Sequence, residues 1–214
     1  MYTKEAIQLK FTKDIGELNK KRADIISAAI AHYYQEKDED INDSLFFYDL
    51  TTKPDEELLE DGAKSIENGL IISPKSLTFL ISLNQQHENA YKLVYEIIVK
   101  VFDTLLLETS NVGFFAEVLG KYYITGDTLE HSLRFMPEGI NFSDAQGVGL
   151  RIFVDNETYT GEYKVEPLVK DTDYYFTEMQ VKYKDFINID DLTNILIKLE
   201  SDIEERTNII LNIK

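Results

Sequence analysis

Two long amphipathic stretches, separated by roughly 105 residues, constrain what this chain can fold into. In residues 88–109, apolar side chains such as Leu93, Ile97 and Val101 recur every three or four positions and make a wide stripe. The stretch 190–203 repeats this spacing with leucine and isoleucine. Such spacing predicts two helices that each bury one face. The first is the more hydrophobic, so we expect it to be a central buried element.

The segments before the first of these helices indicate a strand, a helix and three strands. Residues 6–11 alternate polar and apolar side chains, as a strand does, and helical spacing over 14–36 predicts an amphipathic helix with Asp14 near its N-cap. Residues 44–50 are strand-like. Residues 70–83 predict two apolar strands joined by a turn that contains proline.

The segments before the second long helix repeat this order. Residues 112–125 are rich in strand formers, 128–136 predict a short helix, and glycines punctuate 147–183 into three antiparallel strands joined by short turns. We therefore predict an α+β fold of antiparallel sheets with amphipathic helices packed on one face. The repeated order favours a structural duplication of strand, helix, three strands and helix. Coincidence is the alternative, because the two halves share no residue-by-residue identity.

The duplication would divide the chain into pseudo-repeat halves at 1–110 and 111–214. No change of composition marks a linker between them, so we expect residues 1–214 to fold as a single cooperative unit.

The charge balance narrows the classes of partner. The chain has 39 acidic and 22 basic residues, and its net charge of −17 opposes approach to phosphate backbones and anionic lipid. It contains no cysteine, and no apolar run is long enough to cross a bilayer. We therefore expect a cytoplasmic protein that binds neither nucleic acid nor membranes directly. A protein with a basic surface is the partner that this charge favours, although acidity that serves only solubility is the alternative.

The stretch 163–183, YKVEPLVKDTDYYFTEMQVKY, raises the question of a metal-dependent enzyme. A nuclease of the carboxylate type needs two or three acids and a lysine converging at one edge of a hairpin, where they hold a divalent metal and polarise water. The candidates for this alternative are Glu166, Asp171, Glu178 and Lys182. The other interpretation is a charged, solvated sheet face. Which one holds depends on whether Glu166 and Glu178 meet across the strands.

Strand geometry predicts which way the side chains of this stretch point. Because side chains alternate between the faces of a strand, Glu178, Gln180 and Lys182 share the outward face. The opposite face, which we expect to be the core face, is that of Tyr175, Met179, Val181 and Tyr183.

Other motifs for metal or cofactor binding are incomplete. Residues 38–49 place acids at several EF-hand positions, but the sixth position is Asp43 instead of the glycine that the sharp turn needs. The three histidines are scattered, and the chain has neither a GxSxG elbow nor a glycine-rich phosphate loop followed by lysine. We therefore predict no cofactor and no metal site.

Acidic segments and paired tyrosines are the candidate contacts to a partner protein. The segments 36–43, 55–67 and 200–205 could mimic the spacing of phosphates. Tyrosine pairs such as Tyr174 and Tyr175 place one ring outward in a strand, where tyrosine makes a good interface residue. Filling of strands by tyrosine for its β-propensity is the alternative. The residues that we single out for partner binding are Asp38, Glu39, Asp40, Asp43, Glu56, Glu57, Glu60, Asp61 and Tyr174.

The runs SPKSLTFLISL, YKLVYEIIVKVFDTLLLE and VGFFAEVLGKYYI, followed by three strands and a final helix, carry a resemblance over residues 68–213. In this pattern the chain resembles an uncharacterised α+β family of prokaryotic proteins. It departs from that family at GKYYIT, which lacks the arginine expected there. The family has no assigned activity, so the resemblance implies architecture only.

These observations lead to three hypotheses from different classes. The first is a non-enzymatic, acidic regulatory protein of prokaryotic or phage character that binds another protein, with a homodimer as one form that it could take. In its sharper form it is a defence or counter-defence inhibitor that mimics nucleic-acid charge. The second is a divalent-metal-dependent, nuclease-like enzyme that uses strand carboxylates. The third is a chaperone-like holdase with an exposed apolar groove.

Overall fold

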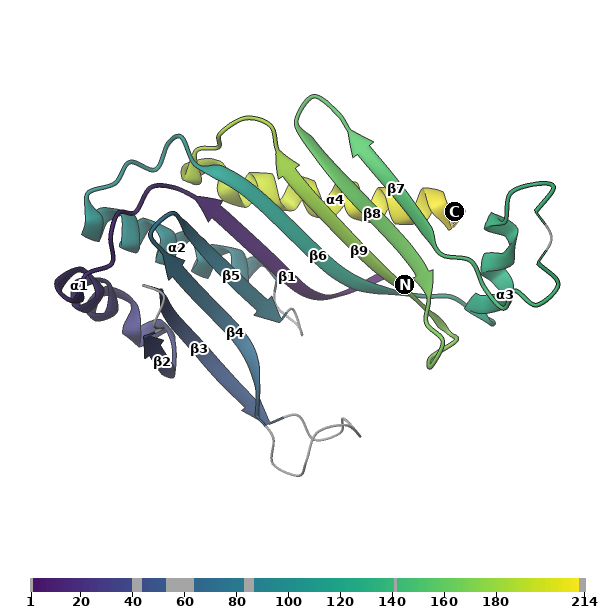
Figure 1. Ribbon diagram of the computed structural model, residues 1–214, viewed down its shortest axis with the longest axis horizontal. Helices are drawn as coiled ribbons and strands as arrows, with labels where there is room; N and C mark the ends of the chain where they lie inside the picture. The colour runs from purple at the N-terminus through teal and green to yellow at the C-terminus, as the bar shows by residue number, and fades with distance from the viewer. Residues whose placement is uncertain (1, 40–43, 53–63, 83–86, 141, 212–214) are drawn as a thin grey trace. The chain divides into compact units, whose positions relative to one another are not determined.

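The computed structural model describes residues 2–39, 44–52, 64–82, 87–140 and 142–211 (Figure 1). The chain divides into two compact units. The first unit combines Met1–Ala6, Phe115–Asp185 and Leu196–Lys214, and the second combines Ile7–Phe114 and Phe186–Ile195. Strand β1 and helix α4 therefore each contribute residues to both units.

The second unit is a sheet with helices. Its strands lie in the order β2-β3-β4-β5-β1, and neighbours from β2 to β5 pair antiparallel. In chain order its main elements are β1 (Tyr2–Thr12, from Ile7), α1 (Lys20–Ile30), η1 (Ala31–Tyr33), β2 (Glu36–Glu39), β3 (Leu45–Thr52), β4 (Lys64–Ser73), β5 (Ser76–Ser82) and α2 (His87–Leu105).

The core of this unit joins the sheet to α2, which was predicted to be a central buried helix. Phe11 of β1 packs edge-on against Phe79 of β5, with 5.9 Å between ring centroids, and lies 5.3 Å from Phe114. Helix α2 buries a stripe at helical spacing and packs against α1. The stripe consists of Tyr91, Val94, Ile97, Ile98, Val101 and Phe102.

Helix α1 begins later than the sequence pattern predicts. We expected a helix from residue 14 with Asp14 near the N-cap, but α1 starts at Lys20, and the Asn19 side chain accepts a hydrogen bond from the Arg22 backbone N–H. Asp14 instead accepts from the backbone N–H of Gly16, whose φ of +79° is left-handed and breaks any earlier helical turn.

The first unit has the same kind of architecture. Its strands lie in the order β6-β9-β8-β7, all paired antiparallel, and α4 crosses behind them in Figure 1. Its main elements are β6 (Gly113–Tyr123, from Phe115), α3 (Thr128–Ser132), η2 (Leu133–Phe135), β7 (Leu150–Asp155), β8 (Tyr159–Pro167), β9 (Tyr174–Tyr183) and α4 (Leu192–Ile210, from Leu196). A 3₁₀ turn, η3 (Ile189–Asp191), precedes α4 and belongs to the second unit.

The predicted duplication is confirmed at the level of topology. Apart from the short strand β2, each repeat runs strand, helix, three strands and helix, and the sheet order β3-β4-β5-β1 of one corresponds to β7-β8-β9-β6 of the other. The short strand β2 has no counterpart in the second repeat. The chain is thus an α+β protein with antiparallel sheets, as predicted.

None of the helices in the described ranges combines the length and the apolar character that a membrane crossing requires.

Candidate functional site

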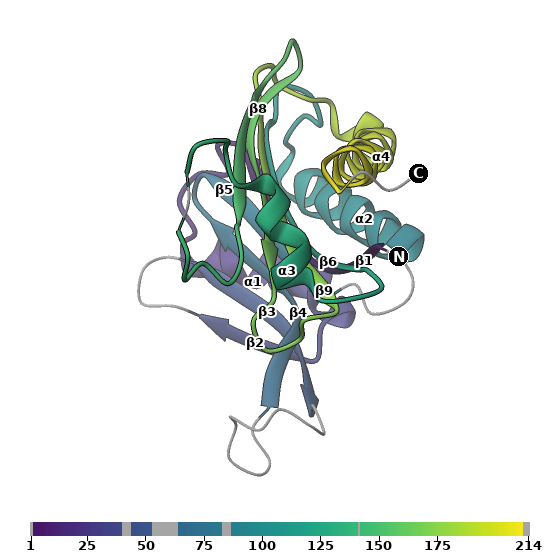
Figure 2. The same cartoon turned by 90° about the vertical axis from the view of Figure 1, so that its right-hand side faces the viewer.

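The first unit presents one face of its sheet to α4 and the other away from it. On β8, the hydroxyl of Tyr159 donates to Asp202 of α4 at 3.1 Å, and the Tyr163 hydroxyl bonds to Thr207 of the same helix. On the neighbouring strand β9, Tyr175, Thr177, Met179 and Val181 share this parity and are buried. We call the side of the sheet away from α4 (Figure 2) the outer face. It carries the alternate residues of β6 to β9.

The alternation of side chains along β9 predicted which residues point to the outer face, and those residues lie there. Tyr175, Met179 and Val181 are buried on the α4 side, while Glu178 and Gln180 are half-buried on the outer face. This arrangement follows because successive side chains of a strand point to opposite faces.

A ladder of polar side chains crosses the outer face. The Gln180 amide donates to Glu117 and to Glu178, both at 2.7 Å. The Lys164 ammonium donates to both carboxylate oxygens of Glu178 at 2.9 Å, and this bond raises the pKa of Lys164. The carboxylate of Glu162 lies 3.6 Å from the same ammonium. The ladder extends to β7, where the Arg151 guanidinium donates to Glu162 at 2.6 Å.

This ladder accounts for Glu178, one of the acids considered for metal-dependent catalysis. Both of its oxygens are engaged by Lys164, which lies directly opposite on β8. Glu166 lies opposite Phe176, not opposite Glu178. Asp171 is exposed in the turn between β8 and β9. The described residues contain no group of three or more histidine, aspartate or glutamate side chains placed to hold a metal ion.

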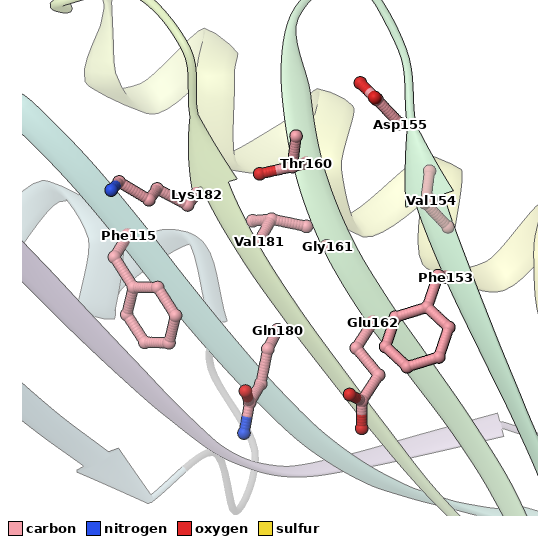
Figure 3. A pocket seen from close by; sticks show the side chains of 10 residues that line it. All are labelled: Phe115, Phe153, Val154, Asp155, Thr160, Gly161, Glu162, Gln180, Val181 and Lys182. Atoms are coloured by element: carbon pink, nitrogen blue, oxygen red, sulfur yellow. The ribbon is translucent and has the colours of Figure 1, made fainter.

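The remaining candidate, Lys182, lines a shallow hollow of about 420 Å³ in the outer face (Figure 3). The hollow lies over four strands, with Phe115 of β6 on one side and Phe153 of β7 on the other. Phe153 is 74% exposed. The other residues that line the hollow are Val154, Asp155, Thr160, Gly161, Glu162, Gln180 and Val181.

A pair of tyrosines occupies the end of β6 and the start of β9. Tyr123 and Tyr174 are directly opposite in the pairing, and their rings meet edge to face with centroids 5.4 Å apart. Asp171 and Asp173, both exposed, belong to the turn that leads into Tyr174. The backbone of Asp173 is tied to β6, since the N–H of Ile124 donates to its carbonyl at 3.0 Å. We call Tyr123, Tyr174, Asp171 and Asp173 the tyrosine patch.

The tyrosine patch contains Tyr174, which the sequence singled out as an outward ring. Tyr123 was not singled out, although it belongs to the Tyr122–Tyr123 pair and its outward ring follows from the same alternation. Next to the patch, the Lys121 ammonium lies 2.7 Å from Glu5. The hydrogen bond to Glu5 is the main cause that raises the pKa of Lys121, and the charges of Asp171 and Tyr174 add to it.

A buried polar contact fixes α3 against the inner side of the sheet. The Tyr175 hydroxyl donates to the Thr128 carbonyl at 3.1 Å and lies 2.7 Å from Nδ1 of His131. Because the single hydroxyl proton goes to Thr128, Nδ1 of His131 carries the proton of the second bond. Burial raises the pKa of Tyr175 to about 12 and lowers that of His131, to which the charge of Arg134 contributes. These residues hold a helix in place.

The acidic residues singled out for partner binding are only partly within the described structure. Asp38 is exposed on β2 and accepts a hydrogen bond from the Tyr48 hydroxyl at 3.0 Å, and Glu39 ends the same strand. Outside the described residues lie Asp40, Asp43, Glu56, Glu57, Glu60 and Asp61. In the segment 200–205, Glu200 binds Lys4 at 2.7 Å and Asp202 binds Tyr159, so part of this charge holds α4 to the first unit.

No family model and no curated protein matches the chain. Among solved structures, it is similar to a chain described as Methanococcus jannaschii TBP, with 12% sequence identity over 95% of this chain and 97% of that one and a TM-score of 0.40. A likeness at this level assigns no function to the chain.

Proposed function

We propose that this chain is a non-enzymatic, acidic protein that binds another protein with a basic surface, and that the tyrosine patch is its point of contact. The observation that carries the proposal is the pairing of two outward tyrosine rings with two exposed aspartates at one corner of the outer face. An arginine of a partner finds there both an aromatic surface and a carboxylate.

The charge balance of the chain supports this proposal. With 39 acidic and 22 basic residues, at least 17 carboxylates have no lysine or arginine of their own within the chain. Such a surplus creates a field that attracts cationic surfaces and raises their rate of association.

The chemistry of the patch favours arginine over lysine as the anchor. A guanidinium is planar, stacks on aromatic rings and donates hydrogen bonds in a fork that matches a carboxylate. Tyr123 is 41% exposed, so its ring remains accessible to such a group. Tyrosine is also enriched among the residues that dominate binding energy at protein interfaces.

The polar ladder supports a binding role instead of a catalytic one. The carboxylates of Glu178 and Glu162 are already paired with Lys164 and Arg151, and Gln180 bridges Glu117 and Glu178. A group whose oxygens are held this way must give up those bonds before it can hold a metal ion. The ladder instead gives the sheet a fixed, rigid outer face beside the patch.

The test is retention of host proteins on the immobilised full chain, compared between the native sequence and three variants. Tyr123→Ala with Tyr174→Ala removes the rings, and Asp171→Asn with Asp173→Asn removes the charge at constant shape. Phe186→Ala serves as the matched control, because Phe186 is 71% exposed but lies in the second unit. We expect a protein that the native chain and the control retain and that both patch variants lose.

The affinity for that protein, once purified, should fall at least tenfold in each patch variant, since interface tyrosines often contribute about 2 kcal/mol. It should also fall as salt is raised from low to high concentration, because the attraction is electrostatic. Retention that is equal in the native chain and in both patch variants contradicts the proposal, and so does binding that salt leaves unchanged.

A further inference from the structure

Strand β7 is the free edge of the first unit's sheet. It is the last strand in the order β6-β9-β8-β7, and among the described residues it pairs with β8 alone (Figure 1). Two of its six residues are exposed apolar side chains: Phe153 is 74% exposed and Ile152 is 38% exposed. The edge of the second unit differs, since β2 has four residues, EKDE, all of them charged.

This difference matters because proteins normally protect their free edges. Short strands, charged residues and proline are the usual means, and β2 uses the first two. Strand β7, with the sequence LRIFVD, has no proline, and it has one charge near each end. An apolar edge of this kind is a template for pairing with another strand.

The backbone of β7 leaves three residues available for such pairing. The N–H of Asn156, just beyond β7, donates to the carbonyl of Tyr159, so Asn156 directs its backbone groups toward β8. Residues of an antiparallel strand alternate in the side to which their N–H and C=O groups point. It follows that Arg151, Phe153 and Asp155 direct their backbone groups toward the free edge.

We propose that β7 pairs antiparallel with the β7 strand of a second copy of this chain, in a register centred on Phe153. This register places each Phe153 opposite the same residue of the other copy. It also places Arg151 opposite Asp155 at both ends of the pairing, and Ile152 opposite Val154 on the other side of the sheet. The occupant is therefore identified by complementarity, because residues 151–155 paired with a second copy in reverse order place opposite charges together and apolar side chains together.

The side chains of Arg151 and Asp155 have further hydrogen-bonding atoms that this pairing can use. Within the described ranges, Arg151 uses only its Nε, for Glu162, and its side chain is 59% exposed. Asp155 uses Oδ1 for Lys184, with 2.6 Å between the atoms, and its side chain is 75% exposed. The two Nη groups of Arg151 and the Oδ2 of Asp155 thus remain for the partner copy. Each of the three outward residues also exchanges backbone hydrogen bonds with its counterpart.

The interface is small, so association is expected at micromolar concentrations. A six-residue edge buries less surface than a standard protein interface of about 1,600 Å². Sedimentation velocity over a range of concentrations should therefore show a monomer that becomes a dimer.

A charge swap tests the register. Arg151→Asp places acids opposite acids in the self-pair, and Asp155→Arg places cations opposite cations. Each single variant should dimerise at least tenfold more weakly than the native chain. The two variants mixed in equal amounts should dimerise again, because each supplies the charge that the other lacks. This rescue also shows that both variants are folded, and circular dichroism of each confirms it.

A cysteine cross-link tests the same register without relying on charge. The chain has no cysteine, so Phe153→Cys introduces a single thiol. Opposite residues in a hydrogen-bonded antiparallel pair have Cα atoms about 5.5 Å apart, within the range of a disulfide. Val169→Cys is the matched control, since Val169 is also 74% exposed but lies outside β7.

Under mild oxidation, Phe153→Cys should form disulfide dimers at least tenfold faster than Val169→Cys. Equal rates for the two overturn the proposal. A chain that stays monomeric at hundreds of micromolar overturns it, and so does a dimer that neither charge variant weakens.

Discussion

The contact between Tyr163 of β8 and Thr207 of α4 gives the sharpest test of how the first unit is held together. Tyr163 is 1% exposed and Thr207 is fully buried. Thr207 donates its hydroxyl proton to the Ile203 carbonyl at 2.7 Å. Its oxygen can therefore only accept from Tyr163, so the tyrosine hydroxyl is the donor. Burial of the Tyr163 hydroxyl raises its pKa.

The direction of the hydrogen bonds predicts unequal effects for the two single substitutions. Thr207→Val keeps the shape but leaves the Tyr163 hydroxyl buried without an acceptor, at a cost of about 1–3 kcal/mol. Tyr163→Phe leaves Thr207 bonded to Ile203 and loses one net hydrogen bond, about 0.5–1.5 kcal/mol. The double variant leaves no orphaned group, so its cost should fall below the sum of the two by about 1 kcal/mol.

Urea unfolding, followed by circular dichroism because the chain has no tryptophan, measures these free energies. Thr104→Val is the matched control: Thr104 donates to the Lys100 carbonyl at 2.7 Å in the same helical geometry, but this bond is exposed to solvent. We expect a change within about 0.5 kcal/mol for the control. If the effects at Tyr163 and Thr207 add to within about 0.3–0.5 kcal/mol, the two side chains do not interact and the argument fails.

Three further predictions concern packing and pH. A Cβ at Gly120 would lie 2.6 Å from the Tyr2 hydroxyl oxygen, so Gly120→Ala should lower the free energy of unfolding by about 1–3 kcal/mol. When Tyr2→Ala has already removed that ring, the same Gly120→Ala substitution should lose most of its effect. Burial raises the pKa of Tyr2, Tyr175 and Tyr183 from 10.0 to about 12. The stability that these raised values contribute is complete below pH 10 and lost as pH rises toward 12, so tyrosinate absorbance should increase there together with unfolding. Burial lowers the pKa of His131 below 6.5, so the unfolded chain binds this proton more readily than the folded chain does. Stability therefore falls as the pH drops below 6.5. The urea midpoint should fall less steeply with decreasing pH in His131→Gln than in the native chain.

Alternation and element order made much of the first unit predictable. The buried rings and side chains of β9, such as Tyr175, Met179 and Val181, follow from the geometry of a single strand. The pairing of Glu178 with Lys164 does not, because strand register depends on residues far apart in sequence. The sequence could therefore place Glu178 on the outer face but could not show what neutralises it.

The start of α1 shows the same limit in a helix. Apolar residues at helical spacing extend back to Ile15, which is buried, and so they indicated a helix from residue 14. The residues of 14–19 are instead tied to the turn between β4 and β5, where the backbone N–H groups of Ile15 and Gly16 donate to the Pro74 carbonyl at 2.8 and 3.1 Å. A non-local backbone contact replaced the local helical one, and helical periodicity carries no information about it.

The exposure of Phe153 could not be predicted for a related reason. The apolar run of β7 is typical of a buried strand, and only its position at the edge of the sheet leaves Phe153 exposed. The position of a strand within a sheet is set by the whole topology. The reverse complementarity of LRIFVD was present in the sequence, but it acquires meaning only once β7 is known to be an edge.

The two proposals together predict bivalent binding. An antiparallel pairing of two edge strands within one sheet has its two-fold axis perpendicular to the sheet, so both outer faces point the same way. The tyrosine patch lies on β9 and β6, separated from β7 by β8, so the pairing of β7 leaves it uncovered. A dimer would then present two patches on one side and bind a partner surface with repeated basic sites more tightly than one patch can. Arg151→Asp should weaken binding to a densely immobilised partner while leaving the affinity for the same partner in dilute solution unchanged. Equal weakening in both formats would show that β7 contacts the partner itself, and the dimer would then have no part in the avidity.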